Sequence, residues 1–494
     1  MQCLSSARRQ VRAEQQQRRR LFPPTDFAHR VSHFDPTSDY RDFHGFFNLF
    51  WIGLAIMAIT TMLRNIKDTG SPFRARIWTL FTVKLWHLAV ADLLMVASTA
   101  IVTVPLQISV VRRVPAGSFW TWARGGMALQ SVYQVAWLVF WVAVPFALDW
   151  AWTSQVFLLL HTMVLLMKMH SYAFYNGHLS ETEKRLTALD NPNTADRAPA
   201  YLYPTVTKSS SSASQSGSSS SATATNSNDI SDLRSALARE LTSPMGNVTY
   251  PHNLTWANHI DFLLCPTLCY EIEYPRLPRI DWPKLASKIV ATFGCIFLLT
   301  VTSEEFILPV LDDASRRLAA TPSTTDALLT LAETVSWLLF PFMVSFLLTF
   351  LVIFEYILGA FAEMTRFADR HFYSDWWNST DWLEFSREWN VPVYSFLRRH
   401  VYGASRPHIG KVNATVITFL VSAIGHEIVM ACIAKKIRGY GFVCQMMQLP
   451  LMVVQQLPAV KGRATTNNVI FWCSMILGLS MVGFFRFSEG MSLD

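Results

Sequence analysis

This sequence has little charge for its length. Only 16% of its 494 residues are charged and 51% are hydrophobic, and its mean hydropathy is positive. A soluble protein of this size usually needs more charge to cover its surface. The formal net charge of +7 is also small. We therefore expect no nucleic-acid binding, but we do expect attraction to anionic lipid headgroups.

The sequence also lacks a disulfide framework and a cleaved signal peptide. Its seven cysteines are scattered, and the spacing of Cys265 and Cys269 matches neither a redox pair nor a zinc knuckle. We expect them to be reduced or simply packed. The arginine-rich start has no apolar core of a signal peptide, so the first spanning helix is expected to act as signal anchor with its basic flank in the cytosol. A mitochondrial presequence is the alternative.

Long apolar stretches are what the sequence has instead. A helix that crosses about 30 Å of hydrocarbon needs roughly 20 mostly apolar residues. About nine stretches meet this length, at 44–64, 84–108, 132–150, 152–174, 285–309, 329–361, 412–434, 440–459 and 467–486. The predicted fold is an all-α polytopic membrane protein with about nine transmembrane helices.

This reading divides the chain into five parts. They are a cytosolic basic tail, helices 1–4, a serine-rich cytosolic insert, helices 5–9 with the catalytic core, and a short tail, at 1–43, 44–175, 176–260, 261–486 and 487–494. The insert is predicted to be disordered because its run of serines from Ser209 has almost nothing to bury.

The charge argument also predicts an orientation. It places loops 176–284 and 362–411 in the cytosol, although the basic loop at 64–83 speaks against this topology. Four sequons match the glycosylation pattern but would not face the glycosylation machinery under this topology: Asn247, Asn253, Asn378 and Asn413.

His426 is the first residue that suggests chemistry. It lies inside an apolar helix, where an ionisable side chain is costly and marks a candidate site. Burial would keep the imidazole neutral and able to accept a proton from an alcohol. The alternative is a hydrogen bond to a neighbouring helix. A zinc-protease motif is excluded because Met430 replaces the second histidine, and Glu427 is not assigned to a His–carboxylate pair because consecutive helical residues point about 100° apart.

The second feature is a segment rich in Trp, Tyr, Asn and acids between 372 and 390. Its tryptophans suit a helix at the membrane surface. That composition does not explain Asn378 and Asn390, each of which directly follows a tryptophan. Such an amide can polarise a carbonyl or orient an imidazole.

The stretch Phe372-Tyr-Ser-Asp-Trp-Trp-Asn378 resembles the FYxDWWN signature of the sterol and diacylglycerol branch of the membrane-bound O-acyltransferases. Trp389-Asn390, His426 and Gln445-Met-Met-Gln-Leu-Pro450 stand in the order of that branch. Pro266 to Arg276 and Lys435 to Tyr440 are similar to the sterol enzymes, the latter to the fungal ones. The resemblance covers roughly 40 to 486 and implies a fold with an internal reaction chamber.

The resemblance implies roles for individual residues. His426 corresponds to the catalytic histidine and Asn390 to the active-site asparagine, with Asn378, Trp389 and Gln448 in support. The signature contributes Phe372, Tyr373, Asp375, Trp376 and Trp377. Acyl-CoA contacts are implied for Tyr402, Lys411 and Ser422. On charge grounds Lys411 suits a phosphate, but an interfacial anchor is the alternative. Where the family often has a histidine, this chain has Tyr394, so that histidine's role is in doubt.

The expected activity is direct transfer of an acyl group from acyl-CoA to a sterol hydroxyl, with neutral His426 as base. Asn390, and with it Gln448, is expected either to stabilise the oxyanion or to hold the ring of His426. A diacylglycerol acyltransferase is the nearest alternative. A lipid transporter, for which no internal repeat is recognisable, and a non-catalytic sterol-binding protein are alternatives of another class.

The expected partners are fatty acyl-CoA, a sterol, membrane lipids and a second copy of the chain in a dimer or tetramer. The expected location is the endoplasmic reticulum membrane. No cofactor and no metal are expected.

Overall fold

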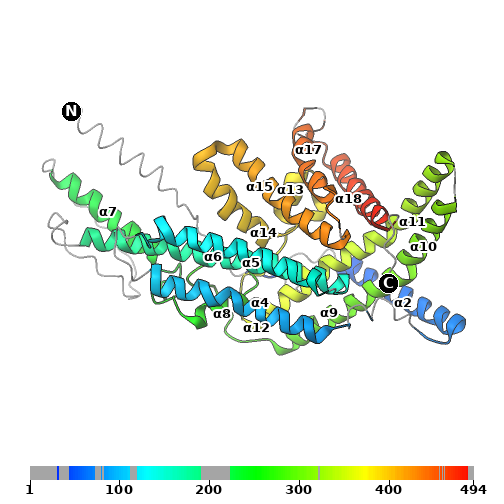
Figure 1. The fold of residues 1–494 in the computed structure, drawn as a ribbon, viewed down its shortest axis with the longest axis horizontal. Coiled ribbons are helices and arrows are strands. Elements are labelled where there is room, and N and C mark those ends of the chain that lie inside the picture. Colours follow the sequence, from blue (N-terminus) through cyan, green and yellow to red (C-terminus); the bar gives the residue numbers. More distant parts are fainter. Residues whose placement is uncertain are drawn as a thin grey trace. The chain divides into compact units, whose positions relative to one another are not determined.

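The structure of this protein is a computed structural model that describes residues 30–32, 44–72, 79, 83–111, 119–148, 150–190, 223–320, 323–434, 436–455, 457–458, 460 and 462–487. Figure 1 shows a helical fold. Extended segments pair only at isolated bridges in this part of the chain. Seven helical stretches are long and apolar enough to cross a membrane: Asn48–Thr69, Leu85–Ser109, Trp122–Ala147, Trp152–Asp190, Trp282–Ala320, Thr324–Met364 and Val391–Cys432. The predicted all-α polytopic class is confirmed.

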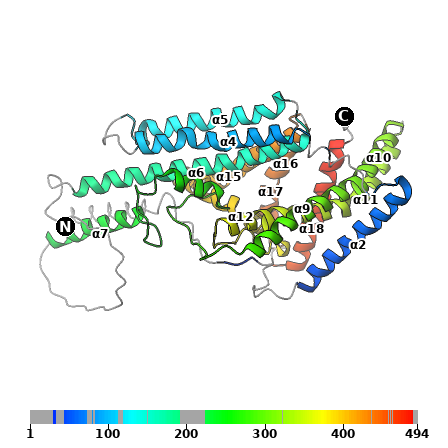
Figure 2. The same ribbon diagram turned by 90° about the horizontal axis from the view of Figure 1, so that it is seen from below.

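The chain forms two compact units. Unit 1 comprises Met1–Asp26, Val90–Val144 and His161–Tyr274, and unit 2 comprises Phe27–Ala89, Pro145–Leu160 and Pro275–Asp494. Unit 1 holds most of α4 (Leu85–Pro105), α5 (Met127–Ala147) and α6 (Trp152–Asp190), the π-helical turns η1 (Leu106–Val111) and η2 (Trp122–Gly126), and all of α7 (Thr223–Leu241) and α8 (Trp256–Leu264). Within it α4 and α5 lie side by side (Figure 2), joined by the Tyr133 hydroxyl, which donates to the Ser98 carbonyl at 2.6 Å.

The predicted insert at 176–260 is wrong as a wholly disordered segment. Helix α6 continues to Asp190, and α7 buries Leu237, Ala238 and Leu241. Arg234 of α7 pairs with Asp190 at 3.1 Å. These few apolar residues at helical spacing suffice to pack α7, whereas composition averaged over the whole stretch hides them. The serine run from Ser209 to Ser221 lies outside the described residues.

A buried lysine organises the next part of unit 1. The Lys168 ammonium donates to the carbonyls of Phe262, Leu263 and Cys265 at 2.9, 3.0 and 2.6 Å, which caps the C-terminal end of α8. Cys265 and Cys269 are both buried. Asn253 is buried and donates to Asn176 at 2.8 Å. Its sequon is therefore closed to a glycan in the folded chain.

Unit 2 contains the helices that carry the predicted site. They are α2 (His44–Thr69), α9 (Trp282–Thr302), η3 (Ser303–Ile307), α10 (Leu308–Ala320), α11 (Thr324–Phe350), η4 (Leu351–Ile357), α12 (Leu358–Met364), η5 (Trp376–Asn378), α13 (Trp382–Glu388), α14 (Val391–Phe396), η6 (Leu397–Tyr402), α15 (Gly403–Ala434), α16 (Tyr440–Met446), α17 (Gln448–Gln455) and α18 (Ala464–Phe487).

The core of unit 2 lies between α2, α9, α11 and η4. Small and branched apolar side chains such as Ala58, Cys295, Leu298, Leu348 and Val352 pack there. The Glu305 carboxylate of η3 is buried. It accepts a hydrogen bond from Asn65 at 2.9 Å and forms an ion pair with Arg64 at 3.2 Å. These contacts join α2 to η3.

The number and limits of the spans differ from the prediction. The stretch predicted as a span at 412–434 belongs to a longer one, Val391–Cys432. The predicted span at 440–459 is wrong, because the chain breaks there into the short helices α16 and α17, each well under the roughly 20 residues needed. A helix does occupy 467–486, within α18, but it is not among the seven.

Candidate active site

The tyrosine of the signature reaches into the helical core of unit 2. The Tyr373 hydroxyl donates to the Glu355 carboxylate at 2.9 Å, and the Ser32 hydroxyl donates to the same oxygen. Burial, followed by the Glu355 charge, holds the pKa of Tyr373 well above its usual range, so the phenol stays neutral and can donate. Tyr373 therefore fixes the start of the signature to η4.

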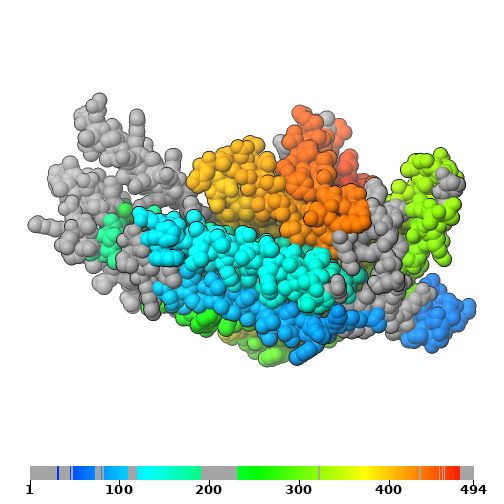
Figure 3. Space-filling view, in the orientation of Figure 1, coloured from blue at the N-terminus to red at the C-terminus, as the bar shows by residue number. Residues whose placement is uncertain are grey.

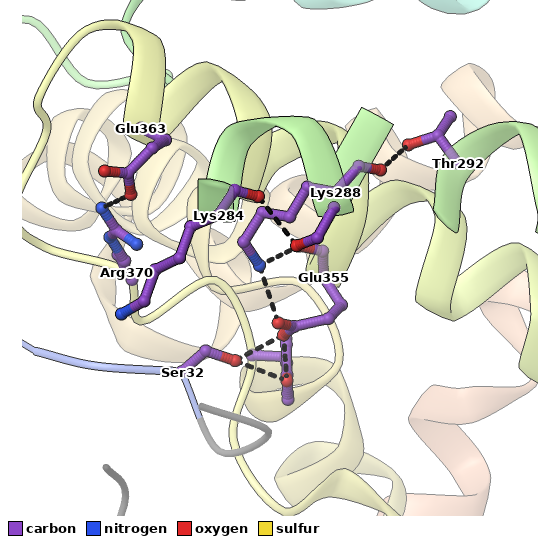
Figure 4. A network of polar contacts seen from close by, with 9 residues as sticks. Ser32, Lys284, Lys288, Thr292, Glu355, Glu363 and Arg370 are labelled. Atoms are coloured by element: carbon purple, nitrogen blue, oxygen red, sulfur yellow. Dashed lines mark hydrogen bonds and ion pairs between the residues drawn. The ribbon is translucent and has the colours of Figure 1, made fainter. Parts of the chain in front are cut away.

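Glu355 is balanced by a lysine that sequence analysis did not single out. The Lys288 ammonium of α9 lies 2.9 Å from a Glu355 carboxylate oxygen and 3.0 Å from the Glu355 carbonyl. Figure 4 shows Lys288 and Ser32 both directed toward Glu355. The available signal was two ionisable residues, each inside a predicted span, which the rule applied to His426 would have marked as partners.

The tryptophans of the signature form an aromatic cluster. Trp376 is only 1% exposed and packs edge-on against Trp389 and Phe350, with ring centroids 4.8 and 5.0 Å apart. Trp389 stacks on Phe346 of α11 at 4.8 Å. Edge-to-face and offset contacts at these distances add to the free energy gained by burial. The surface-helix explanation is wrong for Trp376, because its indole ring is enclosed.

The end of the signature is held by its backbone. The Trp377 carbonyl accepts hydrogen bonds from Asn468 at 2.9 Å and Trp472 at 3.1 Å, both of α18. Asn378 is exposed, and its amide donates weakly to Asp375 at 3.5 Å. The described contacts of Tyr373, Trp376 and Trp377 thus connect the signature to its scaffold.

Glu388 lies beside the signature and has a shifted acidity. Its carbonyl accepts from the Ser374 backbone amide at 2.9 Å. Burial, with the nearby carboxylates of Asp375 and Glu384, raises the pKa of Glu388 to about 7. This carboxyl therefore changes charge near neutral pH.

Asn390 begins the first helix after the signature. Its side-chain oxygen accepts from the Val393 amide at 3.1 Å, which is an N-cap, and Pro392 follows in the first turn, where proline is favoured. The described contacts place no hydrogen bond between Asn390 and His426. The Asn390 oxygen caps α14 while its amide nitrogen remains a donor, so the expected roles of Asn390, toward the oxyanion or the His426 ring, stay predictions.

His426 lies on α15, a long helix with a kink at Gly410. Gly410 has φ 79°, a left-handed conformation that favours glycine. The Nδ1 atom of His426 lies 2.8 Å from the Ser422 carbonyl, one turn earlier. A carbonyl only accepts, so Nδ1 carries the proton in the neutral ring. The second nitrogen, Nε2, is then unprotonated and can act as a base.

The prediction that His426 is buried is wrong in this structure. Its side chain is exposed, as are Val421 and Ile424. The reason is that α15 packs chiefly against α16 and η6, which leaves much of its circumference uncovered. Figure 3 shows part of this orange surface on the visible face.

Three polar side chains gather beside His426. The Gln445 amide donates to the Ser422 hydroxyl at 3.2 Å, and the Gln448 amide donates to the Gln445 oxygen at 3.1 Å. The Gln448 oxygen is enclosed and has no hydrogen-bond partner among the described residues. In this orientation Gln448 keeps an acceptor oxygen and a second amide hydrogen. The two roles expected of it, toward the oxyanion or toward the His426 ring, stay predictions.

Glu427, the residue after His426, stabilises the connection between α15 and α16. Glu427 accepts hydrogen bonds from the backbone amides of Arg438, Gly439 and Phe442 at 3.2, 2.6 and 3.0 Å, which closes the connection between α15 and α16. A side chain at Gly441 would come within 3.2 Å of the His426 carbonyl. The prediction that Glu427 is not paired with His426 agrees with these contacts, and the close approach of α16 explains how Gln445 reaches Ser422.

Residues with implied acyl-CoA contacts are spread along this helical stretch. Tyr402 ends η6, Lys411 is exposed just after the kink, and Ser422 lies one turn before His426. Lys411 and His426 are about 22 Å apart along the helix axis. Only Ser422 of the three has a described hydrogen bond to the cluster around the histidine.

Most of this chain matches one known protein family. Residues 106–488 match the model of the membrane-bound O-acyltransferase family. This match covers most of the chain. The protein belongs to the membrane-bound O-acyltransferase family. The resemblance predicted from the FYxDWWN signature is confirmed.

Several curated relatives are similar over most of the chain. Probable sterol O-acyltransferase 2 of Schizosaccharomyces pombe is 38% identical over 447 residues, which cover 89% of this chain and 86% of the relative. Sterol O-acyltransferase 2 of Candida albicans is 31% identical over 466 residues, with 89% and 74% covered. Diacylglycerol O-acyltransferase 1 of Dictyostelium discoideum is 33% identical over only 240 residues, 48% of this chain and 38% of the relative.

Two further observations bear on the predicted site. In the described part of the chain, no three His, Cys, Asp or Glu side chains gather as metal ligands. Tyr394, at the position where the family often has a histidine, lies in α14, and its backbone amide donates to the Asn390 carbonyl at 2.9 Å. The roles of the predicted site residues remain predictions, which the geometry refines.

Proposed function

We propose that this acyltransferase transfers a fatty acyl group from acyl-CoA to a sterol hydroxyl and so forms a steryl ester. The support is the length and identity of the match to the fungal sterol O-acyltransferases. The single observation in the structure that carries the chemistry is the contact between His426 Nδ1 and the Ser422 carbonyl, since it leaves Nε2 free to accept a proton.

The proposed reaction is one direct transfer. Nε2 of His426 takes the proton of the sterol hydroxyl while the hydroxyl oxygen forms a bond to the thioester carbonyl carbon. The carbon–sulfur bond then breaks, and CoA leaves as the thiolate, which takes the proton back from His426. General base catalysis of this kind contributes about 10²–10⁴ in rate. A thioester is already activated, so no covalent acyl-enzyme, cofactor or metal is required.

The glutamines beside His426 support a place for the acceptor. Gln445 ties Gln448 to Ser422, one turn before His426, so the two glutamines border the place proposed for the acceptor. The sterol hydroxyl has a single hydrogen, which it donates to His426 Nε2 in this proposal, so a hydroxyl oriented by the glutamines accepts from an amide hydrogen. Asn390 acts in this proposal by setting the start of α14, with Asn378 and Trp389 as parts of the signature scaffold.

The proposed route for acyl-CoA follows α15. Lys411, exposed after the kink, is suited to a CoA phosphate. The thioester then lies further along α15, at the level of Ser422 and His426. Tyr402 flanks the entrance. Charged CoA enters from the cytosol and the sterol arrives through lipid, so the two substrates meet within the membrane.

An acceptor assay tests this function. Microsomes that contain the protein receive labelled oleoyl-CoA with either a sterol or diacylglycerol, and the labelled products are separated. We expect steryl ester in excess over triacylglycerol. Triacylglycerol without steryl ester would favour the diacylglycerol alternative, which the half-length match to the Dictyostelium relative supports. Release of no CoA with either acceptor would favour a transporter or a sterol-binding protein.

We further propose the endoplasmic reticulum membrane as the location and a homo-oligomer, a dimer or tetramer, as the assembly. The family membership and the seven apolar helical stretches support a multi-pass membrane protein. The exposed apolar surface near His426 supports a need for further cover, because an ionisable ring is costly against lipid. Fractionation of organelles and cross-linking in the membrane test the two statements.

A further inference from the structure

A cationic cavity lies in unit 2, away from His426. Its volume is about 300 Å³, and the lining includes four cationic side chains, Arg30, Arg279, Lys284 and Arg370, and two carboxylates, Asp281 and Glu363. Arg30 is also paired with Asp369 at 3.2 Å, outside the lining. Small-molecule sites usually have volumes of about 300–1,000 Å³. The cavity is at the small end of that range, which suits a headgroup or a phosphate better than a whole nucleotide.

The walls of the cavity are fixed by backbone pairing. Residues 366–370 run between two other extended segments. On one side the Arg30 amide donates to the Ala368 carbonyl at 3.3 Å, and on the other the Leu277 amide donates to the Arg366 carbonyl at 2.7 Å. Arg30 and Arg370 are therefore held on paired backbone, while Lys284 is held in the first turn of α9.

The base of the cavity is neutral and its rim is positive. The buried guanidinium of Arg370 pairs with the buried Glu363 carboxylate, whose other oxygen accepts from the Asp281 amide at 2.7 Å. Arg279, on the rim, is exposed, and no described residue pairs with it. Figure 4 shows the Glu363–Arg370 pair, with the Lys284 side chain extending toward Arg370.

The position relative to the membrane selects among anions. The apolar span Trp282–Ala320 begins directly at the cavity, and Trp282 is 67% exposed, as expected for an indole at the headgroup level. The loop that contributes Arg279 is on the side predicted to be cytosolic. Basic pockets between helices on that side are suited to phosphorylated lipid headgroups.

We propose that this cavity binds a phosphate monoester group, as carried by an anionic membrane lipid. Arg279 and Lys284 contact the phosphate oxygens from the rim, and the Arg370–Glu363 pair forms the floor. Charge-assisted contacts of this kind are stronger than neutral hydrogen bonds. The site is distinct from the proposed acyl transfer centre.

The test measures binding to the full-length protein in detergent by native mass spectrometry. The probes are dioctanoyl phosphatidic acid, dioctanoyl phosphatidylcholine, inorganic phosphate and CoA. We expect phosphatidic acid to bind at least about tenfold more tightly than phosphatidylcholine, and the double variant Arg279→Gln/Lys284→Gln to lose at least about tenfold in that affinity. The single variant Arg279→Gln, at an exposed position, should have an affinity for phosphatidic acid between those of the unmodified protein and the double variant.

Arg463→Gln serves as the matched control. Arg463 is an exposed cation outside the cavity, in the turn before the helix that holds the signature backbone. The Arg463→Gln variant should bind phosphatidic acid with the same affinity as the unmodified protein. Equal affinity for the two lipids, or equal loss in the control, overturns the proposal. Binding of inorganic phosphate or CoA, abolished by the same double variant, supports the phosphate site but assigns it to a soluble source.

The readout is binding alone. It therefore does not depend on which acceptor, if any, the enzyme esterifies, and the two proposals can fail separately.

Discussion

Two regions of unit 2 carry the residues that sequence analysis singled out, and they are built differently. The signature segment, 372–389, is enclosed by α11, η4 and α18 through aromatic packing and a buried ion pair. The region of α15 to α17, with His426, has few neighbours and an exposed surface. The long recognisable motif thus maintains the scaffold, while the chemistry is expected from the short polar cluster around His426.

The largest difference between the regions should appear when His426 is replaced. We expect His426→Ala to lower steryl ester formation by about 10²–10⁴-fold, because the proton acceptor is removed. The melting temperature in detergent should change little, since the side chain is exposed. Radiolabelled oleoyl-CoA and a sterol give the rate.

His408→Ala is the control for this prediction. His408 is an exposed histidine on the same helix, before the kink at Gly410. The His408→Ala variant should retain the rate of steryl ester formation of the unmodified protein. Normal turnover in His426→Ala would remove this histidine from the mechanism and leave the exposed region without a known role.

The signature region should respond in stability instead. We expect Trp376→Ala to lower the free energy of unfolding by about 3–5 kcal/mol, because a fully buried indole leaves a cavity among Phe350, Trp389 and Trp472. The melting temperature of the purified protein measures this. Trp337→Ala, at an indole that is 67% exposed on α11, should change it little. A full loss of activity at unchanged stability would instead place Trp376 in the reaction.

Sequence analysis recovered the parts that depend on local properties. Spanning helices follow from length and hydropathy, and the FYxDWWN signature was long enough to identify the family. It missed α7, because the apolar residues that pack it are few among polar neighbours. It also missed the cap made by Asn390 and the enclosure of Trp376, since both depend on which segments meet in three dimensions. The exposure of His426 could not be read from a helix that is apolar on all sides.

The buried ion pair beneath the signature gives the next test. Glu355→Gln leaves the Lys288 ammonium without its balancing charge, and removal of one partner of a buried pair typically costs about 3–5 kcal/mol. The lost hydrogen-bond geometry at Tyr373 should add to this. Thermal unfolding in detergent measures the effect.

Two comparisons sharpen the result. The double variant Lys288→Met/Glu355→Leu should recover part of the loss, because neither charge remains buried. Glu333→Gln breaks the exposed pair with Arg317, 2.7 Å apart, and should leave the melting temperature almost unchanged. Equal losses at Glu355 and Glu333 would mean that the buried pair does not anchor the signature.

The smallest effect is expected at Glu388, at the edge of the signature region. Its pKa is raised from 4.5 to about 7 in the folded protein, by burial and by the charges of Asp375 and Glu384. The folded state therefore binds this proton more tightly than the unfolded state does. The resulting stabilisation is fully present below pH 4.5 and is lost as the pH rises through 7. Glu388→Gln cannot titrate, so its melting temperature should fall less than that of the unmodified protein between pH 5 and 8. Asp313→Asn, which removes an exposed acid in α10, should leave the pH dependence as it was. A parallel fall in Glu388→Gln and the unmodified protein would show that Glu388 is not a proton-linked group in the folded protein.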